Sequence, residues 1–300
     1  MEKHMIPIFT LLLFLNSCVD KGKGNNEPRV DESLQTKIET LLSTKNEDVG
    51  IYIMHSKATE TTGVNASEPY AMLSTFKFPI ALAVLHKVEQ GELQMQQLLN
   101  ISKADLREDT YSPFRKKYPN GNIKITLEEA LNWMLQESDN NITDVLLRLI
   151  GGTETVAGFL NNSQIIIKND EAAMHVDWDS QFVNTSTPQA YTTLLKNFDE
   201  GKILNKEHTL WLYNTMAASK TGTARLKGKL PNVVIAQRSG SSFTNDAGVT
   251  GATNNVGIIE LPDGKKIYIC VFIRNTTSNS QTADALIADI SKTAYDHYAM

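Results

Sequence analysis

The segment Val256–Ile273, with the sequence VGIIELPDGKKIYICVFI, determines the fold that we expect for this chain. Two runs rich in β-branched and aromatic residues, 256–261 and 266–273, flank the turn residues Pro262-Asp263-Gly264. This pattern predicts two antiparallel strands joined by a short turn. Another strand-like run precedes them at residues 233–237, so the end of the chain is expected to form an antiparallel meander.

Strand and helix signals are distributed unevenly over the rest of the chain. Residues 49–54 have the pattern of a strand, and residues 280–298 have the periodicity of a helix that packs on the sheet. Helices are expected in the middle, after the capping box Thr126–Glu129 and at residues 143–150, 188–198 and 207–217. The expected fold is α+β: an antiparallel sheet of about five strands, built from both chain ends with flanking helices, plus an inserted all-helical domain.

The first residues have the features of an export signal. Lys3 and His4 precede an apolar run, residues 6–15, which is shorter than the roughly 20 residues that a membrane span needs. The following Leu15-Asn16-Ser17-Cys18 resembles a bacterial lipobox, which implies that Cys18 carries a lipid and becomes the first mature residue. A plain secretory signal cut nearby is the alternative. We therefore expect an exported protein of the periplasm or cell envelope, lipid-anchored at Cys18.

These signals divide the chain into a leader, a tether and one folded domain. Residues 1–17 are expected to be the signal peptide, and residues 18–29, rich in Lys, Gly and Asn, a flexible tether. The folded domain then covers residues 30–300, with an α/β part made of residues 30–73 and 226–300 and a helical part made of residues 74–225.

Composition excludes several classes of partner. The 300 residues are 41% hydrophobic, enough for a substantial core, and the formal charge of −5 with scattered Lys and Arg argues against nucleic acid. Only two cysteines are present, and if Cys18 is lipidated, Cys270 has no intramolecular partner and is expected to be buried in a strand. No Cys/His spacing suggests a metal site, and no cofactor is expected.

A candidate nucleophile lies in Ser74-Thr75-Phe76-Lys77, just before the apolar run 78–85. On a helix this spacing stacks both side chains on one face, so the Lys77 amine can reach the Ser74 oxygen. At a helix start, the N–H of Ser74 is also free to stabilise an oxyanion. The alternative is a serine cap beside a solvated lysine.

A second polar cluster, Ser138-Asp139-Asn140, joins two of the expected helices. Ser138 offers a hydroxyl that can pass a proton, and Asn140 an amide that can bind a substrate carbonyl or orient Lys77. A bland turn would use such residues too. Ser-x-x-Lys, Ser-Asp-Asn and Lys-Thr-Gly together are the signature of class A β-lactamases and penicillin-binding proteins.

The third element of this signature has two candidates. Lys220-Thr221-Gly222 matches literally, but it follows a helix and precedes a basic loop. Arg238-Ser239-Gly240 follows the strand-like run 233–237 and leads into Ser241-Ser242. Because the family motif lies on an edge strand, we assign the role to Arg238-Ser239-Gly240, where arginine keeps the charge but not the geometry of lysine.

With these motifs the chain resembles the class A serine β-lactamases over nearly everything after the tether. Tyr111-Ser112-Pro113, the segment 221–226 and the hairpin 254–264 are similar to further family segments. The resemblance implies that Arg225 neutralises a substrate carboxylate. The substrate-binding residues that it implies are Tyr111, Asn140, His175, Arg225, Arg238, Ser239, Gly240, Ser241 and Ser242.

The same resemblance implies that Glu171 activates the deacylating water from an omega loop. The usual family pattern is Glu-x-x-x-Asn, whereas this chain has His175 in the Asn place, as in a minor subgroup that includes extended-spectrum cephalosporinases. Asn169 and Asn184 replace an Arg and an Asp that pair in many members, so the loop must be fixed differently. A solvated loop carboxylate is the alternative for Glu171.

The implied reaction is hydrolysis of penicillins or cephalosporins through an acyl-enzyme on Ser74. Either Lys77 or Glu171, through a water, takes the Ser74 proton, and Ser138 passes a proton to the leaving nitrogen. The expected protein is a monomer with small-molecule β-lactam substrates, without nucleic acid, and with membrane contact only through the lipid. Two alternatives remain: a D-Ala-D-Ala carboxypeptidase or transpeptidase, which acylates without fast deacylation, and a non-catalytic surface lipoprotein.

Overall fold

The computed structural model describes Met1 and residues 32–299, and the chain from Ser33 onward forms one compact unit. The expected signal peptide, Cys18 and the tether lie outside the described residues. Within the described part, we find no helix that is long and apolar enough to cross a membrane.

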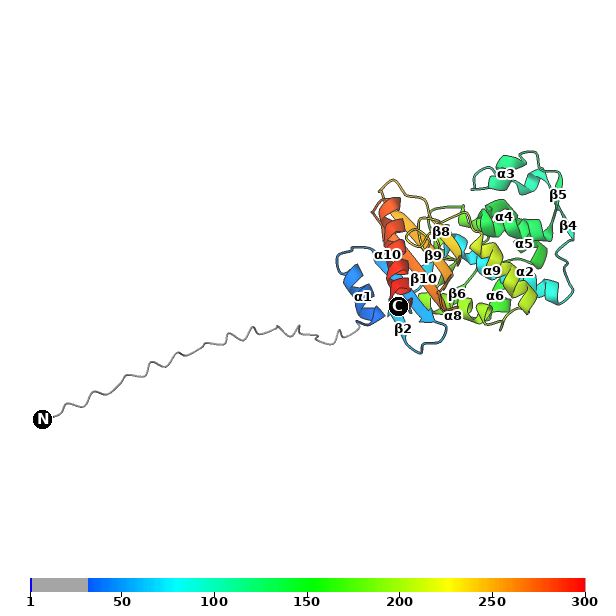
Figure 1. Cartoon of the computed structure of the whole chain (residues 1–300). Coiled ribbons are helices and arrows are strands. Elements are labelled where there is room, and N and C mark those ends of the chain that lie inside the picture. Colours follow the sequence, from blue (N-terminus) through cyan, green and yellow to red (C-terminus); the bar gives the residue numbers. More distant parts are fainter. Residues whose placement is uncertain (2–31, 300) are drawn as a thin grey trace. The chain divides into compact units, whose positions relative to one another are not determined.

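A five-stranded antiparallel sheet forms the centre of the fold (Figure 1). Its strands, in spatial order, are β2 (Thr61–Val64), β1 (Asp48–His55), β10 (Lys266–Thr276), β9 (Thr250–Glu260) and β8 (Ile235–Ser241). Strands from the beginning and the end of the chain are therefore neighbours, and the predicted sheet is confirmed. β9 begins six residues earlier than the pattern predicted, and β8 continues through the Arg238-Ser239-Gly240 triad.

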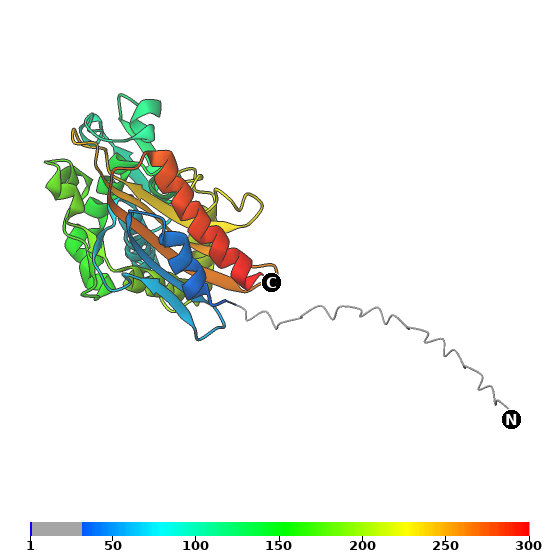
Figure 2. The same cartoon turned by 90° about the vertical axis from the view of Figure 1, so that its left-hand side faces the viewer.

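Helices bury both faces of the sheet. Figure 2 shows α10 (Ser280–Tyr298) and α1 (Leu34–Leu42) across one face, with the helices from the middle of the chain on the other. Along β10, Ile269 and Val271 pack toward α10, whereas Cys270 and Phe272 pack toward α8 (Pro188–Asp199) and its neighbours. Burial on both faces explains why this strand is apolar at almost every position. Cys270 is a buried free thiol, as expected.

The middle of the chain surrounds a buried central helix, α2 (Lys77–Glu89). The other longer helices are α4 (Leu127–Gln136), α5 (Asn140–Ile150), α6 (Thr153–Leu160) and α9 (Lys206–Ala217). The short elements are β3 (Tyr70–Ala71), η1 (Leu73–Phe76), β4 (Leu98–Ile101), η2 (Lys103–Asp105), α3 (Pro113–Lys117), β5 (Ile123–Thr126), β6 (Ile165–Ile166), α7 (Glu171–Met174), η3 (Asp179–Phe182) and β7 (Thr185–Ser186).

Two details of this region differ from the sequence-based expectation. The inserted region is not purely helical, because β4 pairs with β5, and β3, β7 and β6 form another small sheet. α5 begins at Asn140 rather than at residue 143, because the Asp139 carboxylate accepts a hydrogen bond from the Ile142 N–H and caps the helix there. Ser138 and Asn140 are thereby fixed at a helix start.

Candidate active site

Ser74 lies in the 3-10 turn η1, immediately before α2. The preceding Leu73 has a φ of 47°, a left-handed conformation that non-glycine residues adopt at a cost. Strand β8 passes this turn so closely that a Cβ on Gly240 would lie 2.6 Å from the Met72 oxygen and 3.1 Å from the Ser74 nitrogen. Glycine at this position therefore lets the strand and the nucleophile turn come together.

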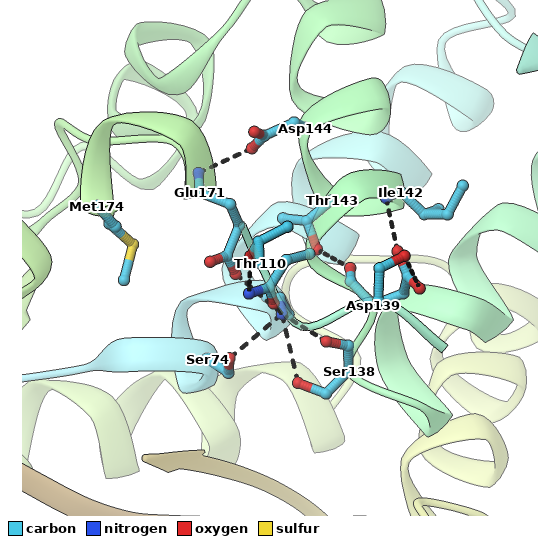
Figure 3. Close-up of polar contacts among 12 residues, drawn as sticks. Ser74, Thr110, Ser138, Asp139, Ile142, Thr143, Asp144, Glu171 and Met174 are labelled. Atoms are coloured by element: carbon cyan, nitrogen blue, oxygen red, sulfur yellow. Dashed lines mark hydrogen bonds and ion pairs between the residues drawn. The ribbon is translucent and has the colours of Figure 1, made fainter. Parts of the chain in front are cut away.

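The Lys77 amine is fully buried at the centre of the site. Its Nζ lies 3.2 Å from Ser74 Oγ, 2.9 Å from the Ser138 carbonyl oxygen and 2.5 Å from Asn140 Oδ1. The same nitrogen forms an ion pair of 2.9 Å with Glu171 Oε1. Figure 3 shows Ser74, Ser138 and Glu171 directed toward this shared centre. Burial lowers the pKa of Lys77, although the negative charge of Glu171 acts in the opposite direction. The lowered pKa makes it easier for Lys77 to lose a proton and become the neutral amine.

The loop between α4 and α5 presents Ser138 in a left-handed conformation with a φ of 62°. Its neighbour Asp139 is buried and accepts hydrogen bonds from Ser112 Oγ at 2.7 Å and the Phe114 N–H at 2.7 Å. Burial raises the pKa of Asp139 above its ordinary range, although these bonds oppose the shift. Asp139 therefore fixes the loop, a role that sequence reasoning did not assign.

Arg238 lies on strand β8, and its side chain reaches the Ser74 turn and the α4–α5 loop. Its fully buried guanidinium donates to Ser138 Oγ, to the Ser74 carbonyl oxygen at 3.1 Å and to the Leu135 carbonyl oxygen at 2.8 Å. Burial lowers the pKa of Arg238 to about 10, so the group stays charged at neutral pH. The positive charge therefore lies directly against the Ser138 hydroxyl.

The literal motif Lys220-Thr221-Gly222 is divided between surface and site. Lys220 is exposed and pairs with Glu137, away from the cavity. Thr221 and Gly222 line the cavity, and Thr221 Oγ1 accepts a hydrogen bond of 2.9 Å from Ser239 Oγ. Sequence reasoning missed these two residues because it judged the motif as a whole.

Glu171 is buried at the start of α7, in the loop 167–184 between β6 and β7, which we call the omega loop. The Asp144 carboxylate of α5 accepts hydrogen bonds from the N–H groups of Glu171, at 2.8 Å, and Ala172, at 3.0 Å. Figure 3 shows the first of these contacts. Burial, and after it the charge of Asp170, raise the pKa of Asp144 to about 7.

The side-chain amide of Asn184 closes the omega loop, in the place where many family members have a salt bridge between an Arg and an Asp. Asn184 Oδ1 accepts from the N–H groups of Lys168 at 2.8 Å and Asn169 at 2.9 Å, and Asn184 Nδ2 donates to the Asn169 carbonyl oxygen at 2.7 Å. His175 contacts the Glu171 carbonyl oxygen through Nδ1 at 2.7 Å and Thr110 Oγ1 through Nε2 at 3.2 Å. His175 thus connects the omega loop to Thr110, whose Oγ1 also accepts a hydrogen bond from Asn140 Nδ2 at 2.8 Å.

A cavity of about 540 Å³ brings most of the predicted residues together. The predicted residues that line it are Ser74, Tyr111, Ser138, Asn140, Glu171, His175, Arg225, Ser239, Gly240, Ser241 and Ser242. Lys77 and Arg238 lie buried behind this wall. Sequence reasoning did not find Trp178 and Phe243, two aromatic residues of the rim, because nothing in their local pattern marks them.

Arg225 lines the cavity, and its guanidinium is already paired with a carboxylate of the protein. It forms an ion pair of 2.6 Å with Asp284 of α10, and it donates to Ser241 Oγ at 2.7 Å and to the Gly240 carbonyl oxygen at 2.9 Å. The residue therefore also fixes the end of β8. Within residues 32–299 we find no cluster of His, Cys, Asp and Glu that could bind a metal ion.

Comparisons with known proteins identify the family to which the chain is related. A family model described as "Beta-lactamase enzyme family" matches residues 33–298. β-Lactamase VEB-1 of Pseudomonas aeruginosa is 39% identical over 89% of this chain and 91% of its own length. Extended-spectrum β-lactamase PER-1 of Pseudomonas aeruginosa is 32% identical over 87% of this chain and 86% of its own length. The crystal structure of the TLA-3 extended-spectrum β-lactamase superposes with a TM-score of 0.87 at 39% identity, over 90% of this chain and 100% of that one.

Proposed function

The chain belongs to the class A β-lactamases and hydrolyses β-lactam antibiotics, and we propose that Ser74, Lys77, Ser138 and Glu171 carry out the reaction. The observation that supports this assignment is the buried Lys77 amine, which contacts the other three residues at one cavity. A nucleophile, a base and a proton donor within hydrogen-bond reach of each other meet the geometric requirement of nucleophilic catalysis.

In the acylation step, Ser74 Oγ attacks the β-lactam carbonyl carbon. Lys77 takes the serine proton, because its Nζ is the basic group in direct contact with Ser74 Oγ and burial favours its neutral form. The N–H groups of Ser74 and Ser241 stabilise the oxyanion. When the carbon–nitrogen bond breaks, the nitrogen takes its proton from Ser138, whose hydroxyl is oriented by Arg238. Lys77 then gives the proton that it took from Ser74 to Ser138, whose Oγ lies 3.3 Å from its Nζ, and both residues return to their starting states.

In the deacylation step, Glu171 takes a proton from a water that attacks the ester carbon. The bond to Ser74 Oγ then breaks, and the proton returns to the serine through Lys77. Tyr111, Asn140, His175, Arg225 and the segment 239–242 surround the substrate. The extended-spectrum relatives and the aromatic rim support cephalosporins with bulky side chains as substrates.

Mass spectrometry of Glu171→Gln with a cephalosporin tests the assignment. The adduct should remain on a Ser74 peptide for minutes or longer, because acylation proceeds while water is no longer activated. Glu92→Gln is the matched control, since Glu92 is exposed, pairs with Lys87 and does not line the cavity. An adduct that never forms, or that clears from Glu171→Gln as fast as from the wild type, contradicts the proposed roles.

We also propose that the protein acts as a monomer, exported and lipid-anchored at Cys18. Class A β-lactamases are generally exported. The apolar run and the lipobox-like segment before residue 19 support the anchor.

A further inference from the structure

The turn that carries Ser74 is contacted by the side chain of Asn254, which does not line the cavity. Asn254 of β9 is fully buried, and its Nδ2 donates to the carbonyl oxygens of Ala71 at 2.7 Å and Met72 at 3.1 Å. These two carbonyls immediately precede the left-handed Leu73. Asn254 Oδ1 has no hydrogen-bond partner, and a buried unpaired acceptor costs about 1–3 kcal/mol. The Asn254 amide therefore holds the two carbonyls of the turn, although its own unpaired oxygen lowers the stability of the fold.

The other end of the turn is contacted by Tyr191 of α8. In an α-helix the Thr75 carbonyl oxygen would accept from the N–H of the residue four positions later, but that residue is Pro79, which has no N–H. The Tyr191 hydroxyl donates to the Thr75 oxygen at 2.7 Å. Tyr191 is fully buried and packs against Phe78 and Phe272. Its hydroxyl thus replaces the donor that the proline removes.

The position of the Ser74 N–H depends on this support. Leu73 is in a costly conformation, which persists only where the surroundings impose it. Gly240, which precedes Ser241 in β8, lies so close to the same turn that a Cβ on it would be 3.1 Å from the Ser74 nitrogen. A shift of the turn would therefore change the distance between the N–H groups of Ser74 and Ser241, which together face the oxyanion.

We propose that Asn254 and Tyr191 are positioning residues for acyl transfer, which fix the Ser74 N–H for the oxyanion through the carbonyls of Ala71, Met72 and Thr75. This inference rests on the proposed function, in which Ser74 is the nucleophile and supplies an oxyanion donor. Neither residue contacts Lys77 or Glu171 by a hydrogen bond. Because an oxyanion forms when Ser74 attacks and again when water attacks the ester carbon, both steps should depend on the position of the Ser74 N–H.

Single-turnover kinetics with a chromogenic cephalosporin separate the two steps in Tyr191→Phe and Asn254→Ala. We expect the acylation rate constant to fall about tenfold in each variant, because small displacements of oxyanion donors have effects of this size or larger. The deacylation rate constant should fall by a similar factor, because its tetrahedral intermediate uses the same N–H groups, whereas the fraction of enzyme that becomes acylated should stay within twofold of the wild type. Tyr191→Phe removes a single oxygen, so it keeps the test valid if Asn254→Ala does not fold.

Thr192→Val is the matched control. Thr192 is buried on α8 next to Tyr191, and its hydroxyl donates to the carbonyl oxygens of Pro188 at 2.9 Å and Tyr52 at 3.1 Å, away from the cavity. This variant should lose thermal stability and keep both rate constants. Variants of Tyr191 and Asn254 that acylate at the wild-type rate overturn the proposal. So does a smaller fraction of active enzyme in which both rate constants remain at the wild-type values, because that result indicates a purely structural role. Wild-type protein that forms no adduct on Ser74 instead overturns the proposed function.

Discussion

At the scale of the residue, Arg238 and Lys220 are two cations with very different surroundings. Arg238 is fully buried and donates to oxygen atoms of Ser74, Leu135 and Ser138, whereas Lys220 is exposed. Arg238→Ala should lower kcat/KM about 100-fold or more, because a charge directed at the reacting groups is lost from a dry site. Lys220→Ala should stay within twofold of the wild type. Steady-state assays measure both effects, and the opposite ranking contradicts the assignment of the cation.

The residues in contact with Lys77 could be predicted from sequence because they belong to short motifs. Ser74, Ser138 and Glu171 each have a hydroxyl or carboxylate in a recognisable context. Asp139 and Asp144 could not be assigned roles in this way. Their carboxylates accept hydrogen bonds from main-chain N–H groups. Almost any residue can supply such a group, so the partner leaves no mark in the sequence. Asp144 lies 27 residues before its partner Glu171, so no local spacing connects the two.

At the scale of the element, the omega loop depends on Asn184. This buried amide makes the contacts to Lys168 and Asn169 that close the loop at its two ends. Asn184→Ala should lower the free energy of unfolding by about 2–4 kcal/mol, because buried main-chain groups lose their partners. It should also slow deacylation. Chemical denaturation measures the first effect, with the exposed Asn162→Ala as control. Equal stability of the two variants contradicts this role.

The start of the omega loop is sensitive to pH through Asp144. The folded protein holds its carboxyl with a pKa of about 7, against an ordinary value of 3.8, because the group is buried and faces Asp170 and Glu171. Between these values the folded state binds a proton that the unfolded state does not bind, so the contribution to stability falls as pH rises, by up to about 1.4 kcal/mol per pH unit. Asp144→Asn removes this titration. The melting temperature of Asp144→Asn relative to that of the wild type should therefore rise from pH 5 to pH 8. A difference between the two proteins that does not change with pH contradicts the assignment.

The ends of strands β8 and β9 that lie at the site could not be predicted from the sequence pattern. Residues 250–255 of β9 and residues 238–241 of β8 are mostly polar, so the apolar alternation that predicts strands is absent. Both segments are nevertheless paired in register with their neighbours. Their side chains serve the cavity and the Ser74 turn, and local preference is therefore overridden at the functional site.

At the scale of the whole molecule, the site lies where distant segments meet. The start of α2, the α4–α5 loop, the omega loop and β8 each contribute one part, and Arg238 reaches Ser74 across 164 residues of sequence. The hairpin 256–273 and the strand 49–54 made the sheet predictable, because both faces bury continuous apolar runs. The helix α1 and the small sheets were not predicted, since they are short and their periodic signals are weak.

The molecule as a whole is proposed to be attached to a membrane only through Cys18. Cys270 cannot serve as an alternative lipid site, because it is fully buried in β10 and burial raises the pKa of its thiol. In fractionated cells that express the full chain, the wild type should sediment with membranes and be released by detergent, and Cys18→Ser should be soluble. Turnover per molecule should be unchanged in Cys18→Ser, because the family match begins only at residue 33. Cys270→Ala is the cysteine control and should remain with the membranes. Wild-type protein that is soluble without detergent contradicts the anchor and supports a plain secretory signal.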